Sequence, residues 1–561
     1  MDERKIIKLA EQQMDRILRF QVMDPQSEHW GGVIRQHTGL PSAENAGGTP
    51  ADLVTLVCLY LHSESAYYHD HRLIAHMEAA IAFIKSAEGR DGLISMDFCN
   101  FDSPPDTAFV VGGLAELYCL IRDSGLTELD RVGAAIFEFL ENTRPGLAQG
   151  GVHTPNHRWV MSAALLWLDF LFNCHECRAR AMEWLAEGID CSKDGEWSER
   201  SNGIYNVLCD VMFFQMWHLL DDESMLEPVR RNIDLVSRLI HPGGLLVTDY
   251  SNRQDRLQPF YIDAYYLVYQ LMAGIDHNKT WSWRAREGAR VMGEHGTKLF
   301  SACTHELLYH MRYPQWMQWE SCEGERPMEK YETYVRQENG GYNLIRNRQD
   351  DASLTLISEL DMVGSFVFGK AHLIGIRPTL GFFGKAVVKP ANWTVLAPGH
   401  YQAHVELVAP YFAPLSPKEI EKLPDTVNPL DMYNSHRREI DTCRMATVLT
   451  VITVANGFDL TWTIDAEWPV FAQMALMFDQ RGHFAQDLGL RHLPNDELLF
   501  EGDKAIYEYG SWRIEVTKLS PGAPLHQLQV IRGDVSRSGT SNLLINSLAP
   551  HDVKLQIRGY R

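Results

Sequence analysis

The sequence has little positive charge for its length. Its 561 residues include 52 Lys and Arg against 73 Asp and Glu, which gives a formal net charge of −21 at pH 7. Proteins that bind nucleic acids usually carry a basic patch or stripe that neutralises phosphates. This balance therefore argues against a nucleic-acid partner.

Long apolar runs are also lacking. No run free of charged residues reaches the length that a membrane-spanning helix needs. The amphipathic segment at residues 1–13 has no apolar core of the kind found in a signal peptide. We therefore expect a cytoplasmic protein that does not bind a membrane.

The cysteines are few and scattered, so they indicate neither a disulfide framework nor a metal site. Only Cys174 and Cys177, among ten cysteines, form a close pair, and no second pair stands at the spacing of a zinc site. We expect no metal and no organic cofactor. Hydrophobic residues make up 45% of the chain, which is typical of a globular protein with two or three domains at this length.

One stretch, Gly150–Asn173, combines a helix start with polar chemistry. Thr154 is a good N-cap residue and Pro155 a good first helical residue, so Asn156, His157 and Arg158 fall in the first turn. The following residues are apolar on nearly all sides, which is typical of a buried helix. The positive end of such a helix suits an anion such as a carboxylate, although ordinary capping and surface roles also fit these residues.

Glycine turns followed by capped helix starts recur along the first half of the chain. The starts are Thr49-Pro50, Ser103-Pro104, Thr154-Pro155, Ser201-Asn202 and Gln258-Pro259. Each precedes an apolar helix, expected at residues 53–61, 108–121, 159–172, 205–219 and 261–272. Amphipathic helices are expected between them, at residues 71–85, 128–141, 177–189 and 223–239. Stacked hairpins of this kind predict an incomplete toroid of five to six α/α units with the inner N-termini at one end. An open helical solenoid that binds a protein is the alternative.

The pattern changes near residues 300–326, where a linker or irregular helix at residues 313–320 ends the helical part. Alternating segments then predict strands at residues 352–360, 446–454, 458–464, 505–508, 512–518, 526–532 and 553–558. A helical or irregular excursion is expected at residues 417–429. The fold class is therefore α+β and multidomain, with an α/α toroid at residues 1–325 and an antiparallel β-sandwich at residues 326–561.

The segment Asp194-Gly-Glu-Trp-Ser-Glu-Arg-Ser-Asn-Gly-Ile-Tyr205 resembles a motif of heparinase II/III-like and oligoalginate-lyase-like polysaccharide lyases. The resemblance implies a toroid followed by a β-domain, with Tyr205 as catalytic base or acid. It implies that Asn156 or His157, about one hairpin upstream, neutralises a uronate carboxylate. It also implies a catalytic histidine in the β-domain, for which His372, His400 and His404 are candidates.

The implied reaction is β-elimination in an acidic oligosaccharide or polysaccharide, which leaves a 4,5-unsaturated uronate end. The uronate C5 proton becomes acidic enough to remove when its carboxylate is neutralised, here by Asn156, His157 and Arg158. Tyr205 then takes the proton, helped by a nearby arginine, and Tyr205 or a histidine such as His372 protonates O4. Candidate substrate-binding residues are His153, Trp197, Arg200, Tyr250, Asn252, Arg253, Tyr261 and His404.

Other functions and roles stay open. The same toroid could carry a glycoside hydrolase, which would need two carboxylates across its cleft. Candidates for that pair are Asp106, Glu196, Glu199 and Asp263. A non-catalytic carbohydrate-binding protein is a third possibility, and a homodimer is compatible with all three. The aromatic candidates, Trp30 among them, could equally pack between hairpins, and Tyr205 could be a core residue.

Overall fold

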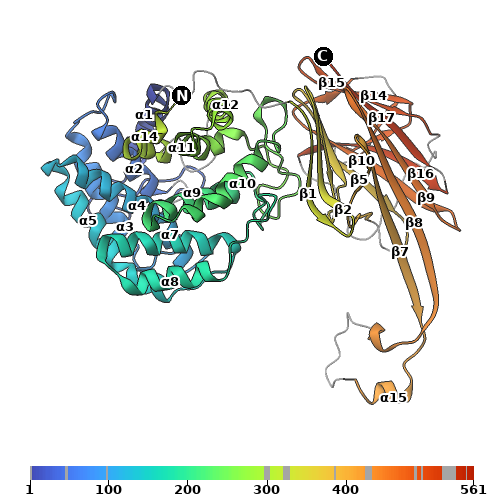
Figure 1. Ribbon diagram of the computed structural model, residues 1–561, viewed down its shortest axis with the longest axis horizontal. Helices are drawn as coiled ribbons and strands as arrows, with labels where there is room; N and C mark the ends of the chain where they lie inside the picture. Colours follow the sequence, from blue (N-terminus) through green and yellow to red (C-terminus); the bar gives the residue numbers. More distant parts are fainter. Residues whose placement is uncertain are drawn as a thin grey trace. The chain divides into compact units, whose positions relative to one another are not determined.

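The computed structural model describes residues 3–44, 48–96, 99–295, 304–319, 329–383, 387–423, 433–485, 489–493, 497–520, 539–550 and 552–561. The chain divides into two compact units (Figure 1). The first contains Met1–Ile240 and Gly244–Pro327, and the second contains His241–Gly243 and Met328–Arg561. The boundary predicted between residues 325 and 326 lies outside the described residues.

The first unit consists of helical hairpins. Its inner helices are α2 (Thr49–Leu61), α4 (Pro104–Ser124), α7 (Pro155–Phe172), α9 (Tyr205–Leu220) and α11 (Tyr266–Asp276). Each packs against the next in this order. Their hairpin partners are α3 (Arg72–Ser86), α5 (Asp130–Asn142), α8 (His175–Ala186), α10 (Leu226–Val236) and α12 (Lys279–His295). This arrangement confirms the predicted alternation of inner and outer helices.

The ring of inner helices is closed by elements from both ends of the unit. Helix α13 (Thr304–Arg312) packs against α1 (Glu3–Phe20) and α2, while α14 (Pro314–Met317) packs against α11 and α13. A short helix, α6 (Arg144–Gln149), lies beside α7 and α8. The contact between α13 and α2 excludes the open solenoid, and the predicted α/α toroid is confirmed.

Burial explains why inner and outer helices differ in sequence. Helix α7 buries side chains on all sides from Asn156 to Leu168, whereas α5 buries a single stripe of Val132, Ile136, Phe139 and Leu140. An apolar residue on any side of an inner helix is thus removed from water, and an outer helix needs only one apolar stripe. The last turn of α7 departs from the expectation, because Phe170 is 57% exposed.

Helix α11 begins later than predicted, and α9 begins at Tyr205 as predicted but without a helical turn at its expected cap, Ser201-Asn202. Helix α9 starts at Tyr205, because the side chains of Asn206 and Asp255 hold the backbone N–H groups of Ser201 and Gly203 in a loop. Helix α11 starts at Tyr266, after a 3-10 turn, Ile262–Tyr265. The preceding Tyr261 is extended and forms a β-bridge with Leu245. In both places backbone hydrogen bonds to a neighbouring segment replace the first helical turn.

The second unit is a sandwich of two sheets. Among the described residues the first sheet has nine strands in the order β1-β2-β3-β4-β5-β10-β16-β13-β12, and the second has eight in the order β11-β14-β15-β17-β9-β8-β7-β6. The first sheet contains β1 (Lys330–Glu338), β2 (Gly341–Gln349), β3 (Ala352–Ile357), β4 (Gly364–Phe368), β5 (Ala371–Leu380), β10 (Val470–Asp479), β12 (Leu490–Leu493), β13 (Glu497–Phe500) and β16 (Thr540–Ala549). The second contains β6 (Thr394–Ala397), β7 (His400–Phe412), β8 (Glu439–Val454), β9 (Gly457–Asp465), β11 (His483–Phe484), β14 (Lys504–Tyr509), β15 (Trp512–Lys518) and β17 (Val553–Tyr560).

The two sheets share one core, in which Phe366 of β4 meets Phe458 of β9 with ring centroids 5.4 Å apart. The predicted antiparallel sandwich is confirmed with one exception, because β13 and β16 pair in parallel, with Leu498 beside Leu543. Parallel neighbours need a crossover connection, and here β14 and β15 of the other sheet lie in that connection. The strand expected at residues 526–532 lies outside the described residues.

Strands β7 and β8 extend beyond their neighbours as a two-stranded ribbon, which projects from the sandwich in Figure 1. Strand β6 pairs with His400–Gln402 alone, and β9 pairs with Ala446–Val454. Past the ribbon lies α15 (Pro417–Ile420), capped by Ser416 and Glu419, in the segment expected to be helical or irregular. Residues 424–429 of that segment are outside the described part of the chain.

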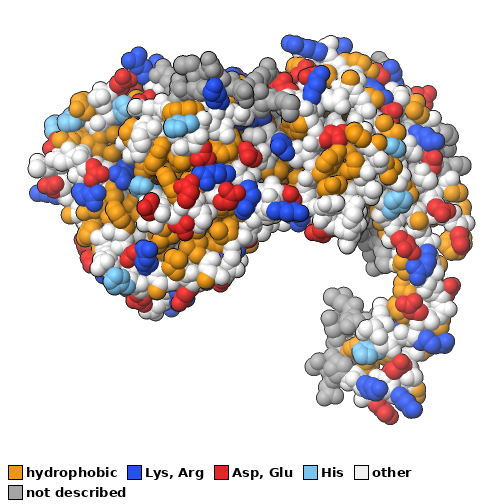
Figure 2. Space-filling view, in the orientation of Figure 1, with side chains coloured by type: hydrophobic (Ala, Val, Ile, Leu, Met, Phe, Trp, Pro, Cys, Tyr) orange, Lys and Arg blue, Asp and Glu red, His pale blue; other side chains and the backbone are white. Residues whose placement is uncertain are grey.

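The visible face of the molecule carries acidic and basic side chains close together (Figure 2). Within the described part of the chain, none of the helices combines the length and apolar character that crossing a bilayer requires.

Candidate active site

The first turn of α7 holds Asn156 against a carboxylate of the same chain. The Asn156 amide donates to Glu199 Oε1 at 2.8 Å and to Oε2 at 3.0 Å, and the Asn156 backbone N–H donates to Oε1 at 3.1 Å. Glu199 is buried, with 6% of its surface exposed. The positive end of α7, where we expected a ligand anion, therefore holds Glu199.

Glu199 also fixes which way the Asn156 amide faces. A carboxylate can only accept hydrogen bonds, so the NH2 group of Asn156 must face it. That same group donates to Thr154 Oγ1 at 3.1 Å, and Thr154, although at the N-cap position, makes no side-chain cap. Asn156 Oδ1 is buried without a hydrogen-bond partner in the described structure. The atom that Asn156 leaves unused is thus an acceptor.

His157 is an uncharged imidazole at neutral pH. Burial, and after it the nearby His153, lower the pKa of His157 to about 4. The His153 ring lies 4.6 Å from the His157 ring between centroids, and His153 itself is exposed. His157 Nδ1 has no hydrogen-bond partner within the described residues. His157 is therefore suited to hydrogen bonding or to accepting a proton.

Tyr205 begins α9 and is half-buried. Its hydroxyl oxygen accepts a hydrogen bond from Gln254 Nε2 at 3.0 Å. The guanidinium carbon of Arg253 lies 4.4 Å from the centroid of the Tyr205 ring, which is a cation–π contact. Two neighbouring residues of one loop thus hold the ring and the hydroxyl of Tyr205.

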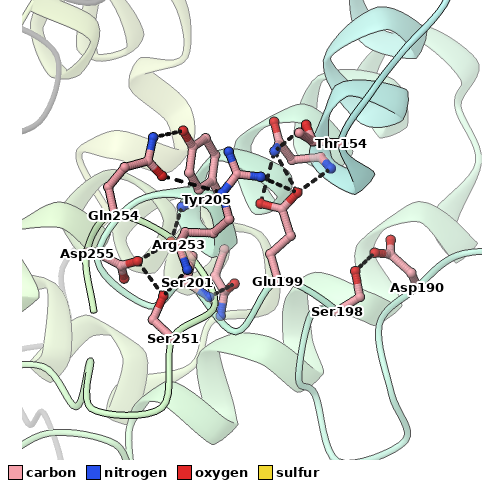
Figure 3. Close-up of polar contacts among 12 residues, drawn as sticks. Thr154, Asp190, Ser198, Glu199, Ser201, Tyr205, Ser251, Arg253, Gln254 and Asp255 are labelled. Atoms are coloured by element: carbon pink, nitrogen blue, oxygen red, sulfur yellow. Dashed lines mark hydrogen bonds and ion pairs between the residues drawn. The ribbon is translucent and has the colours of Figure 1, made fainter. Parts of the chain in front are cut away.

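Arg253 connects the two helix starts. Its Nη1 lies 3.4 Å from Glu199 Oε1, and Figure 3 shows the guanidinium between Tyr205 and Glu199. The side chain of Arg253 is 22% exposed, so part of it reaches solvent. Asp106, at the start of α4, and Arg253 both act electrostatically on His157. The starts of α4, α7 and α9 therefore gather at one site, as the repeat pattern predicts.

Three predicted site residues have partners in the protein that account for their positions. Arg158 Nη1 pairs with Glu187 at 3.2 Å and its Nη2 with Asp190 at 3.3 Å. Trp197, expected to stack on a sugar, is 1% exposed and donates to Asp210 in the core. Tyr250 is also 1% exposed and accepts from Asn202 at 3.1 Å. The burial of Trp197 and Tyr250 argues against the sugar-binding role that was expected of them.

Other predicted sugar-binding residues lie on the loops around Arg253. Asn252 is exposed, and its backbone N–H donates to the carbonyl of Glu199 at 3.3 Å. Arg200 has a left-handed backbone with φ of 56° next to Glu199. Tyr261 is half-buried in its bridge to Leu245.

The β-domain histidines have partners within the second unit. The His372 ring lies 5.7 Å from that of His241, and burial lowers the pKa of His372 to about 4. His241 is buried and its Nδ1 lies 3.0 Å from Ser353 Oγ. His404 is exposed on β7, with its Nε2 2.8 Å from Gln402 Oε1.

Sequence analysis missed several residues of this site. Gln254, Asp255, Ser251 and Ser201 take part in it, and Glu199 was singled out only as a possible hydrolase carboxylate. The available signal was the dense run of polar residues from Ser251 to Asp255 directly after a glycine turn. No group of three or more His, Cys, Asp or Glu that could hold a metal ion occurs among the described residues.

No family model matches the sequence, and no curated protein matches it. Solved structures do match. Xanthan lyase from Paenibacillus is 9% identical with a TM-score of 0.53, and the match covers 100% of this chain and 55% of that one. Chondroitin AC lyase from Streptomyces coelicolor A3 is 10% identical with a TM-score of 0.52, over 99% of this chain and 79% of that one. A mutant of heparan sulfate lyase from Pedobacter heparinus is 12% identical with a TM-score of 0.46, over 90% and 76%.

This chain spans about half the length of the xanthan lyase that it matches. At such low identities the likeness establishes the fold. The chain therefore has the fold of polysaccharide lyases built from an α/α toroid and a β-domain.

Proposed function

We propose that the cluster around Tyr205 cleaves a uronic-acid-containing glycan by β-elimination. The observation that carries the proposal is the position of Arg253, whose guanidinium stacks on the Tyr205 ring at 4.4 Å while Gln254 donates to the hydroxyl oxygen. This arrangement fixes the Tyr205 hydroxyl in position, and a positioned tyrosine can serve as the base that removal of a sugar C5 proton requires. The lyase fold agrees with this chemistry.

In the proposed reaction Tyr205 takes the C5 proton of the uronate. The electrons of the C5–H bond form the C4–C5 double bond, and the C4–O4 bond breaks with its electrons going to O4. The proton returns from Tyr205 to O4. The products are a 4,5-unsaturated uronate and a new sugar hydroxyl, with no water consumed.

Arg253 is the residue that we assign to the uronate carboxylate. It is the cation of this site and is partly exposed, whereas the amide hydrogens of Asn156 are already donated to Glu199 and Thr154. Asn156 then acts through Glu199, which it holds in place beside Arg253. His157, uncharged and next to Asn156, offers a hydrogen-bonding group for the same sugar.

Hydrolysis by paired carboxylates is less well supported by the same contacts. Glu199 accepts three hydrogen bonds from Asn156 and is buried, so it cannot readily exchange a proton with a substrate. Glu196 and Asp263 are buried as well. Asp106 is half-buried and accepts from Asn100 at 2.9 Å and from Ser103. These contacts do not present two free carboxylates to one sugar.

The test is a screen of uronate-containing oligosaccharides for the ultraviolet absorbance of a conjugated unsaturated uronate. Wild-type protein should produce this absorbance with at least one substrate, and Tyr205→Phe should lose it without losing binding. Release of reducing ends without the absorbance, abolished by Asp106→Asn, would favour the hydrolase instead.

A further inference from the structure

A buried carboxylate lies beneath the Tyr205–Arg253 stack. Asp255 is 0% exposed and accepts hydrogen bonds from Ser201 Oγ at 2.9 Å, from the Gly203 backbone N–H at 2.8 Å and from Ser251 Oγ. Ser201 and Gly203 belong to the loop before α9, whereas Ser251 belongs to the loop that carries Arg253 and Gln254. Asp255 therefore joins the two loops from which the site is built (Figure 3).

Each of the two serines that contact Asp255 also contacts the backbone of Tyr205 or Arg253. Ser201 Oγ donates to Asp255 and accepts from the Tyr205 backbone N–H at 3.1 Å. Ser251 Oγ donates to Asp255 and accepts from the Arg253 backbone N–H at 3.1 Å. One carboxylate thus fixes the main chain of both residues through two equivalent serine contacts.

The geometry points to Asp255 as a positioning residue for Tyr205 and Arg253. It holds the guanidinium over the ring by holding the two backbones, and it contacts neither the substrate nor the reacting atoms. This inference rests on the proposed function of Tyr205, and it identifies the residue that pre-organises that function.

The contacts of Asp255 require a carboxylate. Three donors converge on it, and an asparagine would turn an NH2 group toward at least one of them. The loops are also tightly packed at Gly203, so they have no room to adapt by moving closer together. A Cβ atom on Gly203 would lie 2.7 Å from the Phe260 ring and 3.0 Å from Asp255 Cβ, which is closer than carbon atoms pack. Loss of the charge should therefore shift the stack itself.

The experiment compares Ser251→Ala with Ser251→Thr, because only threonine keeps the hydroxyl that reaches both Asp255 and Arg253. With Ser251→Ala we expect kcat to fall by roughly tenfold to a hundredfold, since small misplacements of reacting groups have effects of this size. KM should change less than kcat, because Ser251 itself makes no contact with the substrate. Ser251→Thr should restore most of kcat. Ser198→Ala, which removes an exposed hydroxyl bonded to Asp190 outside this cluster, is the matched control and should behave as wild type.

A second readout needs no substrate. A guanidinium stacked on an aromatic ring has its side-chain NMR resonance displaced by the ring current. The Arg253 resonance, assigned by its loss in Arg253→Lys, should show this displacement in wild type and in Ser251→Thr. It should lose it in Ser251→Ala and in Asp255→Asn.

The two readouts separate the two ideas. If the ring-current displacement persists in folded Asp255→Asn and Ser251→Ala, or if Thr rescues neither readout, Asp255 does not position the stack and the inference fails. If the displacement behaves as expected but no uronate yields the unsaturated product, the inference about Asp255 holds and the proposed function fails.

Discussion

The starts of α7 and α9 lie side by side in this site and differ in the contacts that their polar side chains make. At α7 the polar groups are used by the protein itself, because Glu199 accepts from the backbone and side chain of Asn156. At α9 the side chain of Tyr205 is half-exposed and contacts the amide of Gln254 and the guanidinium of Arg253. The polar groups of the first start are thus bound within the protein, whereas the second start carries the hydroxyl that we propose to react.

This difference indicates how to tell a supporting residue from a reacting one. A buried group whose hydrogen bonds are all internal affects stability when it is removed. A group that exchanges a proton with the substrate affects the rate of reaction when it is removed. The variants below separate the two starts by these criteria.

The largest effect is expected for Tyr205→Phe. It removes the phenol oxygen and keeps the ring against Arg253, so packing is preserved. We expect the rate of elimination to fall by roughly 10²–10⁴-fold, the usual contribution of general acid–base catalysis, while the dissociation constant for substrate changes little. Initial rates and equilibrium binding measured on the same oligosaccharide check this. A variant that turns over at the wild-type rate would make Tyr205 a structural residue.

Arg253→Ala should have the next largest effect. It removes the cation over the Tyr205 ring and, in our proposal, the partner of the uronate carboxylate. Loss of one donor that stabilises developing charge typically lowers kcat by about 10²–10³-fold. Arg253→Lys should recover part of this, since it keeps the charge but loses the planar stacking group. Equal activity of the alanine and lysine variants would contradict a role for the charge.

Glu199→Gln tests whether Glu199 at the start of α7 contributes to stability. Glutamine keeps the shape of the side chain but has only one acceptor oxygen. The donors of Asn156 and Arg253 face two acceptor oxygens in the wild-type glutamate. We expect the free energy of unfolding to fall by about 1–3 kcal/mol, as for a buried group left without its partner. Urea denaturation measures this loss. The rate should fall by less than it does in Arg253→Ala, and the opposite order would show that Glu199 takes part in the chemistry.

His157 should make stability depend on pH. Its pKa is about 4 in the folded protein against 6.5 for an ordinary imidazole. Between these values the unfolded chain binds a proton that the folded chain does not, so stability rises with pH and is lost as the pH falls through this window. In His157→Gln the difference in bound protons between the unfolded and the folded chain should be smaller by up to one, so stability should depend less steeply on pH. Denaturation midpoints of both proteins across the window measure the difference, and parallel curves would contradict burial of a neutral His157.

The smallest effect is expected for Arg158→Ala, which serves as the control for Arg253→Ala. Arg158 lies in the first turn of α7 but pairs with Glu187 and Asp190. We expect a rate within about twofold of wild type and a stability loss of about 1 kcal/mol, typical of partly exposed ion pairs. A loss of rate as large as that of Arg253→Ala would show that Arg158 takes part in the reaction.

The sequence predicts the fold better than the site, and the reason is physical. Apolar periodicity records burial residue by residue, so the alternation of buried α7 with half-buried α8 can be recognised from local sequence. The start of α9 at Tyr205 was predicted. The start of α11 could not be placed, because the β-bridge between Tyr261 and the distant Leu245 keeps the preceding segment out of the helix.

Which residues make up the site is also decided by contacts between residues that are far apart in the sequence. Asn156, His157 and Arg253 could be named from their places after glycine turns, and Tyr205 from the resemblance of its segment to a lyase motif. That Glu199 would occupy the end of α7, 43 residues away along the chain, could not be predicted, because a helix end attracts any anion that the fold brings near. Trp197 shows the opposite error. Its place at a turn tip suggested exposure, and the fold buries it against Asp210.

The central claim is that this site breaks a glycosidic bond by elimination. Mass spectrometry of the products from one uronate oligosaccharide tests it most directly, because elimination adds no water and hydrolysis adds one. We expect that the two product masses from wild-type protein sum to the mass of the substrate, and that Tyr205→Phe forms neither product at a comparable rate. Products whose masses sum to that of the substrate plus one water molecule would contradict it.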